Sequence, residues 1–289
     1  MIIVTGAYGF IGSNIVRELN RRGETELVLV DDLTNGIKYK NLLGAKFKEY
    51  YDADEFFSRF KAWNMVRAVY HQGAISSTTE TDGKKMMHYN YQFSMDLFKQ
   101  CQHHQIPVSY ASSASVYGNN TDGKIDPLNL YAYSKQLIDQ RVAENISNFK
   151  QIHGWRYFNV YGQGEDHKGD QASPVTKFTK QAKETGKIKI FEGSDKIYRD
   201  FVAVDDVVRI VVDSMYNKFR SGIRDLGTGT VMSFETVAHL VKREHGGDIE
   251  VIPFPKQLAS SYQYLTRAKN AIDYRFINMT DWLRKNSKC

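Results

Sequence analysis

The 289-residue sequence contains little that could tie it to a membrane, a disulfide framework or a metal. It has two cysteines, Cys101 and Cys289, which are too few for a disulfide framework or a cysteine cluster, so we expect no metal site. No apolar run approaches the ~18 residues of a membrane span. An apolar strand starts at residue 2, which leaves no room for a signal peptide. These absences favour a cytoplasmic protein without a membrane partner.

The excess of positive over negative charge is also small. The formal net charge is +6, from 39 basic and 33 acidic side chains that are spread along the chain. Nucleic-acid binding would need a basic stripe or a recognisable module, and the sequence has neither, so we expect no nucleic-acid partner. The excess cations either lie on a solvated surface or face an anionic, phosphate-bearing substrate.

The chain does contain a glycine-spaced turn directly after its first strand, with glycines at positions 6, 9 and 12. Gly6 can take a positive φ, Gly9 leaves the backbone bare for a pyrophosphate, and Gly12 lets the next helix pack closely. The N-terminus of that helix directs free N–H groups at phosphates. Asp31, just after the second strand at 27–30, can bind an adenosine ribose. The motif predicts a dinucleotide site, with a purely structural turn as the alternative.

Strand and helix patterns alternate over the first 160 residues. We expect strands at 66–70 and 107–111 and helices at 55–63, 86–103 and 131–149. This rhythm predicts an α/β fold, a doubly wound parallel (Rossmann) sheet with helices on both faces, forming a dinucleotide-binding domain at 1–160. Residues 73–76 and Ser113 follow strand ends, so we expect them to line the cofactor crevice.

After residue 161 the pattern changes. We expect a polar loop at 162–170, helices at 175–184, 205–216 and 234–243, and strands at 188–191 and 200–204. We interpret residues 161–289 as mainly a smaller C-terminal α/β substrate lobe, with elements near 200–235 returning to the first domain.

A tyrosine and a lysine, Tyr131 and Lys135, stand four residues apart at the start of a predicted helix, and therefore on one face of it. An ammonium beside a phenol stabilises the phenolate and lowers its pKa, so this tyrosine could exchange a proton while hydride moves. The Ser113 hydroxyl could hold the same substrate oxygen. Alone, the pair could equally be a surface contact; behind the glycine turn it is far more specific.

Together these motifs resemble the extended short-chain dehydrogenase/reductase family, whose members act mostly on nucleotide-activated sugars. The resemblance covers nearly the whole chain and includes the run Arg-Tyr-Phe-Asn-Val-Tyr-Gly at 156–162. Within the family the chain is most similar to the ADP-glycero-manno-heptose 6-epimerases of lipopolysaccharide precursor synthesis. That similarity rests on Gly-Ala-Ile-Ser-Ser-Thr-Thr-Glu at 73–80, His-Lys-Gly at 167–169, Phe-Glu-Gly-Ser at 191–194 and Arg-Asp-Phe-Val at 199–202.

The resemblance implies oxidation at C6 of the heptose to a transient ketone, rotation of that ketone, and hydride return to its opposite face. It implies Tyr131 and Lys168 as the two acid/base residues, although Lys168 by itself would indicate a solvated loop lysine. The cofactor-binding residues that it implies are Gly6, Gly9, Phe10, Ile11, Gly12, Asp31, Asp32, Lys38, Gly73, Ala74, Ile75, Ser76, Asn90, Tyr131, Lys135 and Val160. The substrate-binding residues that it implies are Ser76, Ser113, Asn159, Lys168, Phe191, Glu192, Gly193, Ser194, Arg199 and Tyr262.

The sequence also departs from that branch. The branch usually uses NADP, but Ala53 stands where a lysine could hold a 2′-phosphate, and Asp32 adds a negative charge beside Asp31. Lys38 remains, so the resemblance implies NADP with NAD possible. Asp170 replaces a loop serine and either repels a diphosphate or pairs with Lys168. We also expect a homo-oligomer.

Other functions stay open at this point. The chain could be an epimerase or reductase for a different nucleotide-diphosphate sugar. A 4,6-dehydratase would need an acidic pair after Ser113, where the chain has Ala114 and Ser115. A nicotinamide-sensing protein without catalysis would commonly lack the tyrosine–lysine pair.

Overall fold

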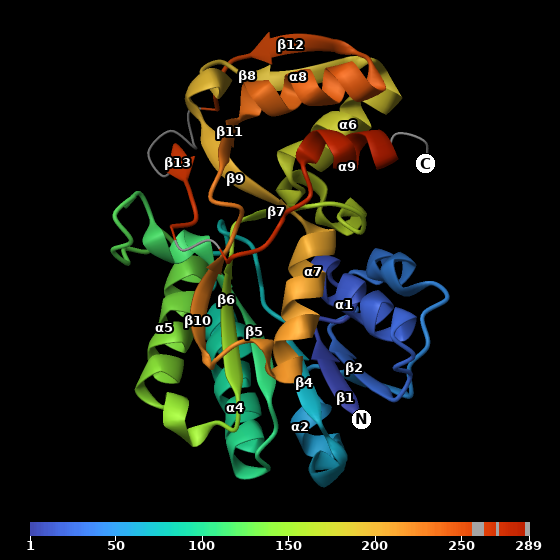
Figure 1. Ribbon diagram of the computed structural model, residues 1–289, viewed down its shortest axis with the longest axis vertical. Coiled ribbons are helices and arrows are strands. Elements are labelled where there is room, and N and C mark those ends of the chain that lie inside the picture. The colour runs from blue at the N-terminus through green and yellow to red at the C-terminus, as the bar shows by residue number, and fades with distance from the viewer. Residues whose placement is uncertain (256–262, 270–271, 287–289) are drawn as a thin grey trace.

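A large parallel sheet forms the base of the molecule, and a smaller lobe lies beyond one end of its strands (Figure 1). The computed structural model describes residues 1–255, 263–269 and 272–286. Seven strands pair in the order β10-β6-β5-β4-β1-β2-β3, all parallel. Their bounds are β1 Ile2–Thr5, β2 Leu27–Asp31, β3 Glu49–Asp52, β4 Ala68–His71, β5 Val108–Ser113, β6 Ile152–Tyr157 and β10 Gly222–Leu226. The predicted doubly wound parallel sheet is confirmed.

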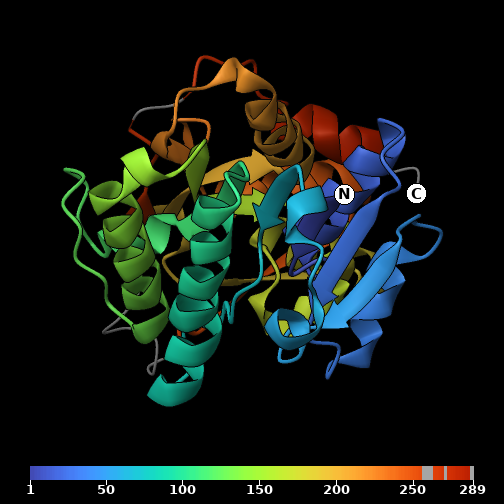
Figure 2. The same ribbon diagram turned by 90° about the horizontal axis from the view of Figure 1, so that it is seen from below.

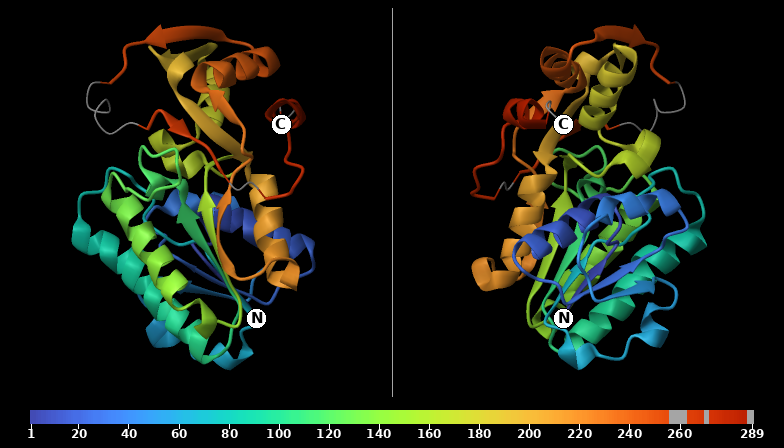
Figure 3. Two further views of the ribbon diagram at one scale, coloured as in Figure 1. Left: turned by 60° about the vertical axis from the view of Figure 1, so that its left-hand side comes forward. Right: turned by 90° about the vertical axis from the view of Figure 1, so that its right-hand side faces the viewer.

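Helices cover both faces of this sheet because its strands are apolar on both sides. Ile2 and Val4 of β1 pack toward α1 (Phe10–Arg21) and α7 (Val204–Asp213). Ile3 points the other way, into a core shared with α4 (Phe93–His103) and α5 (Leu130–Glu144). From below, α4 and α5 stand side by side on their face (Figure 2), and two side views show the helical layers flanking the sheet (Figure 3). Because the seven strands are parallel, their carboxyl ends all point the same way, toward the lobe (Figure 1).

Two local predictions in the first half differ from the structure. Residues 32–54, for which the sequence analysis gives no helix or strand between the strand at 27–30 and the helix at 55–63, contain β3 and the 3-10 helix η1 (Gly36–Leu42). The predicted helix at 55–63 is wrong: only α2 (Phe56–Arg59) and the 3-10 turn η2 (Trp63–Met65) form there. Phe60 is extended after α2, and its ring packs against the Trp63 ring at 5.0 Å. Aromatic packing thus overrides the helical pattern.

The other predicted helices of this half form with shifted ends. Helix 86–103 is confirmed as α3 (Gly83–Met86), a π-helical turn η3 (Met87–Gln92) and α4. The helix expected at 131–149 is α5, which ends at Glu144 and is followed by the short η5 (Ile146–Asn148).

In its described residues, the lobe contains two small sheets and three α-helices. β7 (Asn159–Tyr161), β11 (Val231–Ser233) and β13 (Leu265–Thr266) join β9 (Tyr198–Ala203), and β8 (Lys187–Phe191) pairs with β12 (Asp248–Ile252). The helices are α6 (Pro174–Thr185), α8 (Phe234–His245) and α9 (Met279–Asn286). Between β9 and β11 the chain returns to the base as α7, the π-helical η8 (Ser214–Lys218) and β10. No helix in the described part of the chain has the length and apolar character needed to cross a membrane.

Candidate active site

The glycine turn between β1 and α1 has the shape of a phosphate cradle. Gly6 adopts φ +61°, and a Cβ there would lie 2.6 Å from the nitrogen of Gly73. A Cβ on Gly12 would lie 2.0 Å from the Gly6 carbonyl oxygen, so α1 packs too closely for any side chain. Gly9 is the N-cap of α1 and no side chain caps that end. The free N–H groups of the first turn and the bare backbone fit a pyrophosphate.

Asp31 ends β2 beside this turn, and its carboxylate already has two partners. The backbone nitrogen of Tyr8 donates to Oδ2 at 2.7 Å, and Lys38 Nζ donates to Oδ1 at 2.6 Å. Lys38 also donates to the Asp32 carbonyl oxygen at 2.6 Å. The Asp32 side chain is exposed, and hydrogen bonds from Thr34 lower the pKa of its carboxyl. Lys38 therefore neutralises Asp31 next to the expected ribose position, while the Asp32 carboxylate keeps its charge without an ion pair to this lysine.

Buried polar side chains hold the loop that follows β4 in place. Thr5 Oγ1 accepts from the nitrogen of Gly73 at 3.1 Å and hydrogen-bonds to Nδ1 of His71 at 2.6 Å. Burial lowers the pKa of His71 to about 3, so this ring is neutral. Asn90 is fully buried and its amide makes two hydrogen bonds to the backbone of Ile75. In this structure Asn90 hydrogen-bonds to the backbone of the loop, while Ser76, the next residue after Ile75, is exposed.

Tyr131 and Lys135 occupy the first turns of α5, as the spacing predicts. Ser113, at the end of β5, lies near the Tyr131 phenol and acts to lower its pKa. The Ser113 oxygen accepts from the Ser115 hydroxyl at 2.8 Å, so its own hydroxyl proton remains available for donation. Lys135 Nζ donates to the Ala111 carbonyl oxygen at 2.7 Å. The serine and the tyrosine therefore lie close together.

The expectation that Lys135 lowers the pKa of Tyr131 is wrong in this structure. Burial raises the pKa of the phenol, and the nearby Ser113 hydroxyl only partly opposes that shift. Burial also lowers the pKa of Lys135 to about 8, despite the nearby carboxylate of Asp139. Desolvation disfavours the charged form of both groups.

A buried ion pair behind Lys135 escaped the sequence analysis. Asp139 accepts from Arg156 Nε at 2.8 Å, from the Tyr110 hydroxyl at 2.9 Å and from the Ser112 hydroxyl at 2.9 Å. It therefore links α5, which carries Tyr131 and Lys135, to the end of β6 and to β5, which ends at Ser113. Its position four residues after Lys135 was a signal that could have found it.

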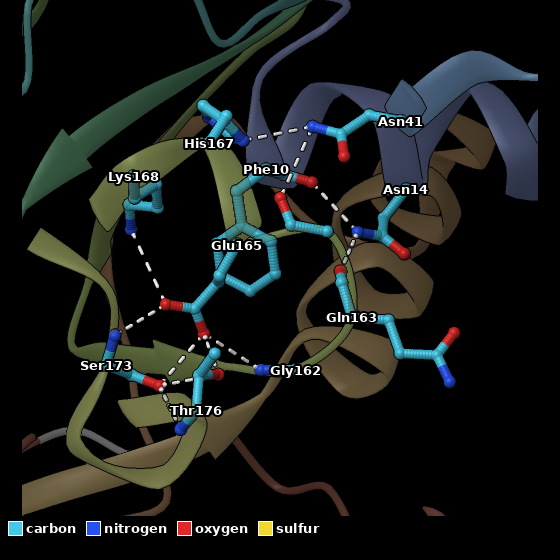
Figure 4. Close-up of polar contacts among 11 residues, drawn as sticks. Phe10, Asn14, Asn41, Gly162, Gln163, Glu165, His167, Lys168, Ser173 and Thr176 are labelled. Atoms are coloured by element: carbon cyan, nitrogen blue, oxygen red, sulfur yellow. Dashed lines mark hydrogen bonds and ion pairs between the residues drawn. The ribbon is translucent and has the colours of Figure 1, made fainter. Parts of the chain in front are cut away.

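The loop that carries Lys168 lies against the glycine turn (Figure 4). Much of it is the 3-10 helix η6 (Asp166–Gln171). Lys168 Nζ lies 5.1 Å from the centre of the Phe10 ring in α1 and 3.9 Å from Glu165 Oε2. Burial lowers the pKa of Lys168, and the Glu165 carboxylate opposes this shift. The ion pair of Lys168 is thus with Glu165, while Asp170 is exposed.

Two asparagines fasten this loop to the dinucleotide turn. Asn14 Nδ2 donates to the Gln163 carbonyl oxygen at 2.9 Å. Asn41 Nδ2 donates to the Tyr8 carbonyl oxygen at 2.9 Å and contacts His167 Nδ1 at 3.1 Å. The predicted lysine loop and the predicted phosphate cradle are therefore one connected structure. No pattern in the sequence links Asn41 to position 167.

The expected substrate residues lie on lobe elements around β8 and β9. Phe191 ends β8 and packs edge-on against Phe254, with ring centres 5.5 Å apart. Arg199 in β9 is buried, with its guanidinium 5.6 Å above the Phe234 ring. Other members are Asn159 in β7, Glu192 and Gly193 in the turn after β8, and Ser194, whose buried hydroxyl has no partner in the described structure. Val160, expected to bind the cofactor, follows Asn159 in β7. Tyr262 lies outside the described residues.

Comparison with known proteins identifies the family. Residues 2–223 match the family model described as the NAD dependent epimerase/dehydratase family. The chain is 46% identical to an ADP-L-glycero-D-manno-heptose-6-epimerase of Alkalilimnicola ehrlichii, over 93% of this chain and 88% of that protein.

Solved structures agree on the fold. The chain is similar to the Helicobacter pylori ADP-L-glycero-D-manno-heptose-6-epimerase, with a TM-score of 0.83, 29% identity and coverage of 99% of this chain and 93% of that one. A UDP-N-acetylglucosamine 4-epimerase from Methanobrevibacter ruminantium shares the fold at TM-score 0.85 and 21% identity, covering 99% and 96%. This chain belongs to the NAD-dependent epimerase/dehydratase family.

Proposed function

We propose that this member of the family is a nucleotide-sugar epimerase that inverts C6 of an ADP-glycero-manno-heptose. The observation that carries the proposal is that both proton-transfer candidates lie near carboxyl-terminal features of one parallel sheet. Tyr131 lies near Ser113 at the end of β5, and Lys168 lies against Phe10 of the glycine turn that follows β1. The 46% identity to a heptose 6-epimerase supports the same substrate.

The residues that would hold a nicotinamide dinucleotide belong to the glycine turn and to the segments at the carboxyl ends of β2 and β4. The backbone of residues 6–12 would bind the pyrophosphate, Asp31 would bind the ribose, and the loop of Gly73 and Ile75 would line the crevice. When bound, the cofactor would supply hydride acceptance and hydride return.

Inversion through a ketone needs a proton acceptor and a proton donor in two orientations of the sugar, because the hydride donor stays in place. In our proposal Tyr131 exchanges the proton of the C6 oxygen in one orientation, while Ser113 holds that oxygen. Lys168 exchanges it in the other orientation. The lowered pKa of Lys168 suits this role, since the neutral amine becomes accessible nearer to neutral pH. Arg199 would bind the diphosphate.

We also propose NADP as the cofactor, with NAD as a competent substitute. Lys38 is the cation that could meet a 2′-phosphate, but it now neutralises Asp31 and would have to be shared. A cytoplasmic location, supported by the cysteine content, and a homo-oligomeric state, supported by the family resemblance, complete the proposal.

The test is turnover by the purified protein. Either C6 epimer of ADP-glycero-manno-heptose, followed by proton NMR, should become a mixture of the two epimers without added cofactor or net oxidation. UDP-glucose should remain unchanged in the same assay. Epimerisation of UDP-glucose alone would assign a different sugar, and nicotinamide binding without any turnover would identify a sensor.

A further inference from the structure

A buried carboxylate stands between the two ends of the lysine loop. Glu165 is 1% exposed. Its Oε1 accepts from the nitrogen of Gly162 at 3.1 Å, from the Ser173 hydroxyl at 2.9 Å and from the Thr176 hydroxyl at 3.0 Å. Its Oε2 accepts from the nitrogen of Ser173 at 2.6 Å. Figure 4 shows this carboxylate at the centre of its donors, with Lys168 on the open side.

These donors hold the two ends of the loop together and keep the Glu165 carboxylate in one position. Gly162 begins the loop, and Ser173 is the N-cap of α6, so a single side chain joins the two ends. An ionised carboxylate only accepts hydrogen bonds, which matches four donors. It also stands at the positive end of the α6 dipole. Glu165 is therefore a rigid negative charge rather than a solvated loop residue.

Lys168 lies next to this charge, and its burial disfavours the ammonium form. The Phe10 ring of α1 also attracts the ammonium through a cation–π contact. His167, the neighbouring titratable group in the loop, has its pKa lowered by burial and by the positive charges of Lys38 and Lys168. In the described structure Glu165 is the acidic group paired with Lys168.

We propose that Glu165 is a positioning residue of the reaction, which fixes the Lys168 ammonium at the glycine turn and stabilises its positive charge. This inference rests on the proposed function, in which Lys168 exchanges a proton with the sugar. Glu165 itself contacts neither substrate nor cofactor in this proposal; it acts through Lys168.

The first measurement follows the lysine without any turnover. The purified protein is treated with a limiting amount of acetic anhydride across a pH series, and acetylation of Lys168 is quantified by peptide mass spectrometry. Because only the free amine reacts, the midpoint reports its pKa. Removing an opposite charge within ion-pair distance should lower the midpoint in Glu165→Gln by about one to three pH units.

Asp166→Asn is the matched control, since it removes one negative charge from the adjacent, exposed position. Its midpoint should stay with the wild type. An unchanged or higher midpoint in Glu165→Gln, or an equal fall in both variants, would overturn the proposal. If Glu165→Gln does not fold, Glu165→Asp replaces it: the retracted charge should give a smaller fall, and no fall would overturn the proposal.

The second measurement is the pH profile of epimerisation. Displacing a reacting group by about 1 Å can cost ~10²-fold, so kcat of Glu165→Gln should fall by about that factor while KM changes less. The limb assigned to Lys168 should move to lower pH, and Glu165→Asp should recover part of the rate. A rate loss with an unmoved limb would reduce Glu165 to a structural role. The two proposals can also fail separately. If the acetylation midpoint of Glu165→Gln falls as expected but the wild type turns over no ADP-heptose, the proposed function is refuted and the Glu165–Lys168 pairing stands.

Discussion

Replacing Gly12 by alanine tests whether the close approach of α1 to the turn builds the cofactor site. The Cβ added at this position would lie 2.0 Å from the Gly6 carbonyl oxygen, whereas real Cβ contacts do not fall below 3.0 Å. The turn or the helix must therefore shift by about 1 Å. Both partners are backbone, so no flexible side chain can absorb the movement.

Two opposing terms set the expected stability. Alanine favours a helix over glycine by about 1 kcal/mol, and overpacking of this kind costs about 1–3 kcal/mol. We therefore expect Gly12→Ala to lose up to about 2 kcal/mol of unfolding free energy in urea. Dinucleotide binding should suffer more, because each hydrogen bond to a charged group contributes about 1.5–3 kcal/mol. Loss of one such bond to a phosphate weakens affinity at least tenfold.

Gly83→Ala is the control for the same chemical change. Gly83 begins α3, and its added Cβ would make only an ordinary contact, 3.8 Å from Leu130 Cδ2. It should keep or exceed the wild-type stability, by up to about 1 kcal/mol, and should retain the wild-type NADP and NAD affinities, measured by urea unfolding and by fluorescence titration. Wild-type stability and affinity in Gly12→Ala would show that the turn accommodates a side chain and would refute the packing argument.

Four further outcomes can be checked with the same protein. Tyr131→Phe and Lys168→Met should each slow epimerisation, followed by NMR, by about 10²–10⁴-fold while cofactor affinity stays unchanged; full activity in Lys168→Met would leave Tyr131 as the sole base. Lys135→Met should also weaken NADP binding in calorimetric titration, and an unaltered affinity would contradict its expected contact with the nicotinamide ribose. NADP and NAD affinities should differ by no more than about tenfold, because Lys38 is shared with Asp31 and such a pair contributes about 1 kcal/mol or less; a hundredfold NADP preference would argue against this sharing. Burial lowers the pKa of His71 to about 3 in the fold, against an ordinary value of 6.5. The unfolded chain therefore binds the proton first, and stability should fall as pH drops below 6.5, by up to about 1.4 kcal/mol per pH unit. A His71→Gln variant should show a flatter urea midpoint against pH, and an equally steep curve would assign the acid sensitivity elsewhere.

The parts of the fold that the sequence predicts are those with local signals. The parallel sheet follows from short apolar strands that alternate with amphipathic helices, and the turn follows from the spacing of its glycines. β3 was not predicted because its Glu-Tyr-Tyr-Asp run lacks an apolar pattern, and it is the outermost strand beside β2. The short helix at 56–59 shows how packing among Phe56, Phe60 and Trp63 can end a helical pattern early.

The same division holds for the candidate site. Tyr131, Lys135 and Ser113 were found because helical spacing and strand ends determine where they meet. Glu165 and Asn41 were not, because their partners lie in loops whose path depends on the whole lobe. The pKa of Tyr131 was predicted in the wrong direction, since the sequence indicates a neighbouring charge but not the depth of burial.

The return of the chain to complete the main sheet has a consequence for synthesis. β10 pairs along its whole length with β6, from Gly222 beside His153 to Leu226 beside Tyr157, although β7, β8 and β9 lie between the two strands in the sequence. A fragment that ends at residue 160 would leave the hydrogen-bonding groups on one edge of β6 unpaired, and would expose the apolar side of α1 that α7 covers. An exposed strand edge of this kind promotes aggregation. During synthesis we therefore expect the half that holds the glycine turn to stay prone to aggregation until residue 226 has left the ribosome, and we expect a gene cut between β6 and β7 not to yield a stable dinucleotide-binding unit.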